Sequence, residues 1–135
     1  MSTDERKIPL ILVVDDSPEI RAMVSTHLEQ QKCEVIQAED GEQGLTMLLN
    51  NKPDLVLLDV MMPRLNGWEI AKYMRERSEF DNTGIIMVTA IGETVNEMTS
   101  PLYGADDHIN KPFQLAELDF KIRRTLSQKR QQMAS

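Results

Sequence analysis

The sequence has a single cysteine, few aromatic residues and no hydrophobic stretch that approaches the length of a membrane span. One cysteine cannot form an internal disulfide, which fits a reducing compartment. A transmembrane helix needs about 20 consecutive apolar residues, and nothing near the N-terminus resembles a signal peptide. These absences argue against a disulfide-stabilised or membrane-spanning chain. They predict a cytoplasmic protein without a membrane partner.

A basic surface is also lacking. The formal net charge is -7, whereas a nucleic-acid-binding surface needs a stripe of positive charge. Basic residues gather only near the C-terminus, at Arg123, Arg124, Lys129 and Arg130. These positions fall near the end of an expected helix, where the helix dipole favours cations. We therefore expect no direct contact with nucleic acid.

The length of 135 residues and the content of 41% hydrophobic and 27% charged residues are typical of one globular domain. Residues 1–7 are polar and charged, so we expect a flexible N-terminus. Residues 128–135 form a polar C-terminal tail, and we expect the chain to be loose from Ser127 onward. The folded domain is expected to span residues 8–127.

Five short segments have the pattern of strands. Runs of four or five mostly branched apolar residues, bounded by turn residues, are typical of strands buried in a parallel sheet. The expected strands are Leu10–Val14, Glu34–Ala38, Leu55–Leu58, Ile85–Val88 and His108–Asn110. Helical patterns alternate with them. This alternation predicts an α/β fold, a doubly wound parallel sheet with helices on both faces.

Five helices are expected between and after these strands. Ser17 and Pro18 supply an N-cap and a first helical residue for the first helix. The helices lie at about 18–28, 41–50, 67–74, 93–103 and 115–126. Pro101 falls inside the fourth, where an interior proline costs roughly 3 kcal/mol. We therefore expect that helix to be kinked, shortened or restarted at Ser100.

Polar residues follow four of the expected strands. Asp15 and Asp16 follow the first strand, Asp59 the third, Thr89 the fourth and Lys111 the fifth. In an open parallel sheet, ligands bind in the crevice beyond the carboxyl ends of the strands. We therefore expect three carboxylates, a hydroxyl and an ammonium to meet in one cleft.

The three carboxylates need a positive partner. Two like charges about 4 Å apart repel by roughly 4 kcal/mol at an effective dielectric near 20. A hard divalent cation removes this repulsion, so Asp15, Asp16 and Asp59 predict a site for Mg²⁺ or Mn²⁺. The alternative is that Asp15 or Asp16 merely caps the helix that begins at Pro18, although Ser17 already serves as a cap.

Asp59 follows an unbroken apolar run, so its carboxylate is expected at an exposed edge, where it can act as a nucleophile and form an aspartyl phosphate. Phosphoryl transfer needs mainly positioning and charge neutralisation. The cation and Lys111 would neutralise charge, and the Thr89 hydroxyl could donate to a phosphoryl oxygen. Taken singly, Thr89 is equally explained as a satisfied strand-end hydroxyl and Lys111 as a solvated charge. The Lys111–Pro112 bond has a cis option that would aim the lysine across the cleft.

Four segments carry a resemblance to a known family: ILVVDDSPE, DLVLLDVMMPRLNGWE, IIMVTA and GADDHINKPF, spread from Leu10 to about Leu126. Together they resemble the receiver domain of two-component response regulators, in its single-domain, chemotaxis-regulator-like form. The resemblance implies a flavodoxin-like fold of five helices and strand order 2-1-3-4-5. It also implies a phosphoacceptor signalling domain that assists only its own phosphorylation and dephosphorylation, not an enzyme.

Carried over residue by residue, the resemblance makes Asp59 the phospho-acceptor. It makes Asp16 the direct Mg²⁺ ligand, Asp15 the water-mediated ligand and the backbone carbonyl of Met61 a further ligand. The phosphoryl group would come from a histidine kinase or a histidine phosphotransfer protein.

The remaining matched positions concern switching and lifetime. Thr89 matches the family's switch hydroxyl and Lys111 its phosphate-neutralising lysine. His108 stands where the family usually carries Tyr or Phe; a packed or surface histidine is the plainer interpretation, and a pH-sensitive coupling is the sharper one. Met61 and Ile91 flank the implied path of hydrolytic water and are apolar, so we hypothesise slow autodephosphorylation.

The preferred interpretation is a switch in which phosphorylation shifts a two-state equilibrium. The face formed by the fourth helix, fifth strand and fifth helix would then meet a protein partner, and the chain would be a monomer or weak homodimer. Three alternatives are weaker. A phosphatase resembling the haloacid dehalogenase family would start from Asp-x-Asp, and an FMN binder would carry a Ser/Thr/Gly-rich phosphate loop. A phosphorylation-independent interaction module would not need the intact acidic site.

Overall fold

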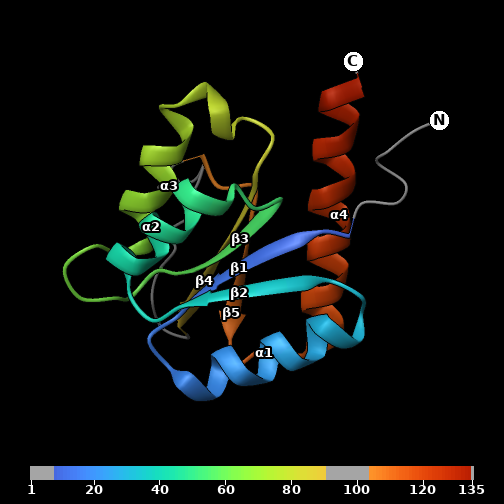
Figure 1. The fold of residues 1–135 in the computed structure, drawn as a ribbon. Coiled ribbons are helices and arrows are strands. Elements are labelled where there is room, and N and C mark those ends of the chain that lie inside the picture. Colours follow the sequence, from blue (N-terminus) through green and yellow to red (C-terminus); the bar gives the residue numbers. More distant parts are fainter. Residues whose placement is uncertain (1–7, 91–103, 135) are drawn as a thin grey trace.

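The computed structural model describes residues 8–90 and 104–134. These residues form one five-stranded parallel sheet in the order β2-β1-β3-β4-β5 (Figure 1). The strands are β1 Leu10–Val14, β2 Glu34–Ala38, β3 Leu55–Asp59, β4 Gly84–Ala90 and β5 Asp107–Lys111. The α/β class, the parallel sheet and the implied strand order are therefore confirmed.

Four α-helices and one short 3₁₀-helix accompany the sheet in the described part of the chain, where five α-helices were expected. They are α1 Pro18–Gln30, α2 Gly41–Asn51, α3 Gly67–Arg75, η2 Ser78–Phe80 and α4 Leu115–Ala134. The expected helix over 93–103, with its interruption at Pro101, lies outside the described residues. Among the helices of these residues, none combines the length and apolar composition that a membrane span requires.

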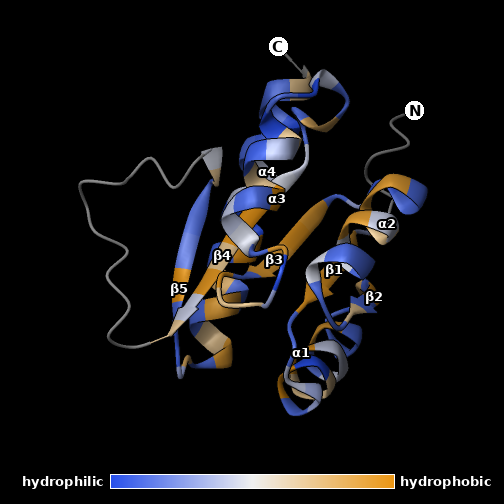
Figure 2. Ribbon diagram, turned by 90° about the vertical axis from the view of Figure 1, so that its left-hand side faces the viewer, coloured by the Kyte–Doolittle hydropathy of each residue, from blue (hydrophilic) through white to orange (hydrophobic). Residues whose placement is uncertain are grey.

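Helices cover both faces of the sheet, because the strand side chains alternate between two buried clusters. Ile11 packs in a cluster with residues of α1 and α4, including Leu118. The next residue, Leu12, packs on the opposite face with Leu48 of α2 and Ile70 of α3. In Figure 2 the middle strands β3 and β4 are largely hydrophobic, as expected for strands covered on both sides.

The first helix begins where the sequence predicts. The Ser17 side chain accepts a hydrogen bond from the Ile20 N–H at 3.3 Å, and Pro18 occupies the first turn. This cap satisfies a backbone donor that has no partner inside the helix. It also fixes the turn that leads away from the end of β1.

The loop between β3 and α3 folds closely over the end of β3. Asn66 and Glu69 form a capping box, in which each side chain accepts the backbone N–H of the other residue. A Cβ atom at Gly67 would meet the backbone oxygen of Asp59 at 2.7 Å. Glycine at this position therefore allows the start of α3 to approach Asp59.

The last helix is longer than expected. α4 continues to Ala134, so the expectation of a loose polar tail after Ser127 is wrong for the described residues. Lys129 is only 7% exposed, and its ammonium lies 3.1 Å from a carboxylate oxygen of Asp106 and 3.3 Å from the backbone oxygen of Asp81. A lysine can bury its stem while its charged end finds partners, which the polar composition of this segment did not reveal.

Candidate functional site

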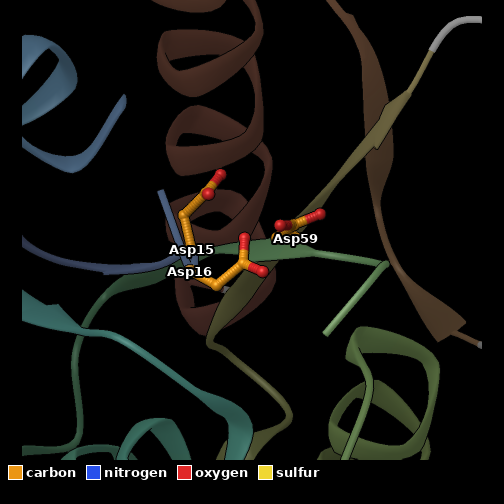
Figure 3. A group of neighbouring side chains, drawn as sticks. All are labelled: Asp15, Asp16 and Asp59. Carbon is orange, nitrogen blue, oxygen red and sulfur yellow. The ribbon is translucent and has the colours of Figure 1, made fainter. Parts of the chain in front are cut away.

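Three carboxylates meet at the carboxyl edge of the sheet, as the sequence predicts (Figure 3). Asp15 and Asp16 follow β1, and Asp59 is the last residue of β3, which pairs directly with β1. One oxygen from each carboxylate lies within 4.8 Å of the other two. Asp15 and Asp59 are 2% and 4% exposed, whereas Asp16 is exposed. The cluster is thus buried on its inner side and accessible at Asp16.

Asp15 makes contacts in two directions. Its Oδ1 accepts a hydrogen bond from the Ser17 N–H at 2.9 Å, which holds the turn into α1. Its Oδ2 lies 2.9 Å from Lys111 Nζ. Ser17, and not Asp15, is the N-cap of α1, so the capping alternative does not describe Asp15. One Asp15 oxygen holds the turn before the helix, and the other faces the lysine of the site. The Arg21 guanidinium donates to the Asp15 backbone oxygen at 2.7 Å, a contact that the sequence pattern did not indicate.

Lys111 contacts two of the three acids. Its ammonium lies 2.9 Å from Asp15 Oδ2 and 3.5 Å from Asp59 Oδ2. The residue ends β5, and the peptide bond to Pro112 is cis. Burial lowers the pKa of Lys111, but hydrogen bonding and attraction from the two carboxylates outweigh it, so the net shift is upward. Lys111 is therefore a charged partner of the acids and not a solvated side chain.

The pKa of Asp59 is raised from 3.8 to about 6. Burial is the largest cause, and repulsion from Asp15 adds to it, while Lys111 opposes the shift. The Met61 N–H, which donates to Asp59 Oδ1 at 3.1 Å, also opposes it. One ammonium thus faces three carboxylates, and the cluster as a whole is negative. A bound cation would lower the cost of ionising Asp59.

Thr89 lies at the same edge but contacts the neighbouring strand. It is fully buried near the end of β4 and pairs in register with Asn110 of β5. Its hydroxyl donates to the side-chain oxygen of Asn110 and lies 3.5 Å from the Ile109 carbonyl oxygen. The hydroxyl therefore engages β5 in this structure. Asn110 was not among the expected site residues, although its position directly before Lys111 at a strand end was an available signal.

His108 lies near the start of β5, away from the strand ends that carry the acids. Its backbone N–H donates to the Asp107 side chain at 2.8 Å, and its carbonyl oxygen accepts from Lys121 Nζ at 2.8 Å. These contacts connect β5 to α4. A pH-sensitive role of its imidazole stays a prediction.

The loop after β3 places apolar side chains beside Asp59. Met61 is 60% exposed and borders a hollow of about 500 Å³, which is also lined by Val60, Met62, Pro63, Asn66 and Trp68. The Met61 side chain has no polar group that could orient a water molecule. The second position of the lifetime hypothesis, Ile91, lies outside the described residues, so slow autodephosphorylation stays a prediction.

The fold and site together define a doubly wound, flavodoxin-like α/β domain with an acidic, lysine-bearing carboxyl edge. Comparison with known families agrees with this class. The family model described as "Response regulator receiver domain" matches residues 11–123, and the chain belongs to this family. It is a family of signalling domains and not of classical enzymes.

Individual relatives support the assignment. The "Probable transcriptional regulator ycf27" of Cyanophora paradoxa is 43% identical over 116 residues, covering 86% of this chain and 47% of the relative. The phosphate regulon transcriptional regulatory protein PhoB of Pseudomonas aeruginosa is 39% identical, covering 86% and 51%. The chain thus spans about half the length of these curated relatives. The structure of the chemotaxis protein CheY4 of Vibrio cholerae is similar with a TM-score of 0.80 and 32% identity, covering 88% of this chain and 99% of that one.

Proposed function

We propose that this chain accepts a phosphoryl group on Asp59 from the phosphohistidine of a histidine kinase or a histidine phosphotransfer protein, in a Mg²⁺-dependent reaction. The supporting observation is the convergence of three carboxylates within 4.8 Å and of the Lys111 ammonium on two of them. As the setting we propose two-component signalling in the cytoplasm; membership of the response regulator receiver family supports the signalling role, and relatives named as transcriptional regulators and a chemotaxis protein agree with it.

The residues present fit a magnesium ion. The site offers oxygen ligands, which Mg²⁺ prefers, and Mg²⁺ commonly takes one or two carboxylates and keeps several waters. Asp15, Asp16 and Asp59 would hold the ion together with the backbone carbonyl of Met61. The solvent exposure of Asp16 leaves room for waters on that side. When bound, the ion would neutralise charge on the transferring phosphoryl group.

The transfer itself uses Asp59 as nucleophile. A carboxylate oxygen of Asp59 forms a bond to phosphorus, the bond between phosphorus and the donor imidazole nitrogen breaks, and the imidazole keeps the electron pair. The Met61 N–H holds Asp59 Oδ1 at 3.1 Å and so orients the carboxylate. Lys111, already 3.5 Å from Asp59 Oδ2, would bind a phosphoryl oxygen and offset its negative charge.

The signal would pass through Thr89. Its hydroxyl now donates to Asn110, and it can instead donate to a phosphoryl oxygen on Asp59, since Asp59 ends β3 and Thr89 is next to the last residue of the neighbouring strand β4. This exchange would free the Asn110 side chain and alter the surface formed by β5 and α4. We propose that this face, including His108, binds a downstream protein while the chain is a monomer or weak homodimer.

Acetyl phosphate and Mg²⁺, followed by intact-mass and peptide mass spectrometry, test the proposal. We expect one phosphoryl group on Asp59 in the wild type and none in Asp59→Asn. The exposed carboxylate Asp81 offers a matched control, so Asp81→Asn should be modified like the wild type. Modification of Asp59→Asn to the wild-type level, or none in the wild type with Mg²⁺ present, would contradict the proposal.

A further inference from the structure

A second cavity lies at the other end of α1 from the acidic cluster. It has a volume of about 450 Å³ and is bordered by the C-terminal end of α1 and by α4. In Figure 1 the C-terminal end of α1 lies near α4, and both helices pack on the same face of the sheet. The volume falls in the range of about 300–1,000 Å³ that is usual for small-molecule sites.

The floor of this cavity is apolar. Leu28 of α1 and Ile122 of α4 are buried, with 2% and 3% of their surfaces exposed, and Leu126 is partly buried against the same cluster. All three side chains border the cavity. Leu28 and Ile122 are already largely out of water, so the gain on binding would come mainly from the apolar surface of the ligand and of Leu126. The floor therefore suits an apolar chain or ring.

The rim carries two arginines whose side chains have no polar partner among the described residues. Arg123 and Arg130 border the cavity and are exposed, seven residues apart on one face of α4, about 10 Å along its axis. Among residues 8–90 and 104–134, neither guanidinium group has an ion pair or a hydrogen bond. Both guanidinium groups are therefore available to an anionic ligand. A guanidinium group matches a carboxylate through two parallel hydrogen bonds.

One acid also borders the cavity, but it is already engaged. Both oxygens of Asp119 lie close to His27 Nε2 of α1, at 2.8 and 2.9 Å. Asp119 is therefore directed to the neighbouring helix. The charge left for a ligand at the rim is that of the two arginines.

We propose that this cavity binds a small single-chain amphiphile with a carboxylate head and an apolar tail. The tail would lie on Leu28, Ile122 and Leu126, and the carboxylate would bind Arg123 or Arg130 at the rim. This proposal is independent of phosphorylation at Asp59, which lies at the carboxyl edge of the sheet.

Cys33 provides a direct readout, because it is the only cysteine of the chain and borders the cavity. Burial, and in second place the Asp119 carboxylate, raise the pKa of its thiol, so its reaction with a disulfide reagent should be followed at a fixed alkaline pH. Dodecanoate below its micelle concentration should slow this reaction in the full chain. Decanoate, two methylene groups shorter, should bind roughly tenfold more weakly. Titration calorimetry would measure the same affinities without the reagent.

Matched variants separate the proposal from simple hydrophobic binding. The double variant Arg123→Gln, Arg130→Gln should lose most of the protection, whereas Lys72→Gln, which removes an exposed charge on α3, should keep it. Equal protection by dodecanol would show that the carboxylate of the ligand is not recognised. Full protection in the double variant would show the same. Protection only by vesicles of anionic phospholipid would identify a membrane surface and overturn the small-molecule site. Absence of both protection and binding heat would overturn the proposal entirely.

Discussion

The two ends of the parallel sheet hold carboxylates in different electrostatic settings. At the end where β5 begins, Asp106 faces two cations, with Arg75 Nη2 at 3.0 Å and Lys129 Nζ at 3.1 Å. At the carboxyl end, three acids cluster, and among the described residues Lys111 is the cation that contacts two of them, Asp15 and Asp59. At the first end the chain's own cations fully offset the carboxylate, and we call Asp106, Arg75 and Lys129 the balanced cluster. The second end has an excess of negative charge.

The comparison shows how structural and functional charges can be distinguished. Arg75 also donates to the backbone oxygens of Phe80 and Thr83, at 2.8 and 3.0 Å, so the balanced cluster joins α3, β4, β5 and α4. The charged groups of this cluster have partners within the protein, and we expect these contacts to stabilise the fold. In the acidic cluster, part of the negative charge has no partner in the chain and is available to a ligand. The same burial and repulsion raise the pKa of Asp59. We expect the acidic cluster to favour binding at the expense of stability.

The largest expected effect is loss of the balanced cluster. Asp106→Ala leaves the mostly buried Arg75 and Lys129 without a carboxylate, and removing one partner of a buried ion pair costs about 3 kcal/mol. Urea unfolding should show this loss of stability. Asp81→Ala, at an exposed carboxylate, should change stability by less than about 0.5 kcal/mol. Equal effects of the two substitutions would remove the distinction between them.

At the acidic end, removal of a carboxylate should raise the free energy of unfolding, whereas at the balanced cluster it should lower it. The raised pKa of Asp59, from 3.8 to about 6, corresponds to about 3 kcal/mol of destabilisation when the carboxylate is ionised. Asp59→Asn should therefore stabilise the metal-free protein at pH 7, by up to this amount. Urea unfolding in the presence of a chelator measures it. A less stable variant would show that Asp59 contributes to the fold and is not a source of strain.

The gain from Asp59→Asn should depend on pH. Because the pKa of Asp59 is raised by folding, the folded wild type binds more protons than the unfolded chain between about pH 4 and 6. Its stability relative to the variant should therefore fall as pH rises through this window. Below about pH 4 the Asp59 carboxyl is protonated in both the folded and the unfolded state, so its ionisation should no longer make the wild type less stable than the variant. A difference that does not change from pH 4 to 7 would assign the effect to packing.

The smallest effect is expected at Thr89. Thr89→Val keeps the shape but removes the hydrogen bond to Asn110, which should cost about 1 kcal/mol in thermal or urea unfolding. Phosphate incorporation at Asp59 should continue, because Lys111 and the acids are intact. The phosphorylation-dependent change at β5, followed by NMR shifts of that strand, should be lost. An unchanged response would exclude the Thr89 hydroxyl as the connection.

Much of the site could be predicted because its residues sit at strand ends. Asp15, Asp16, Asp59 and Lys111 each end or follow an expected strand, and parallel topology brings those ends together. Local patterns were also sufficient for the start of α1 at Pro18. The strand order came from the family resemblance, since alternation of strands and helices does not specify it.

The parts that were missed depend on contacts between distant segments. Lys129 looks like a polar tail residue, and only its approach to Asp106 and Asp81 shows why α4 continues. The sequence likewise does not indicate that Arg75, on an amphipathic helix, contacts Asp106. The role of Asn110 follows only from its hydrogen bond with Thr89. Long flexible side chains can reach several partners, so sequence spacing alone does not fix the choice.

Magnesium binding tests the central claim, an uncompensated acidic cluster, most directly. Titration calorimetry of the metal-free protein should show one Mg²⁺ site, with affinity at least about tenfold weaker in Asp16→Asn, which removes an accessible ligand charge. The control Asp81→Asn should bind like the wild type. Equal affinity of Asp16→Asn and the wild type, or no binding by the wild type, would contradict the account.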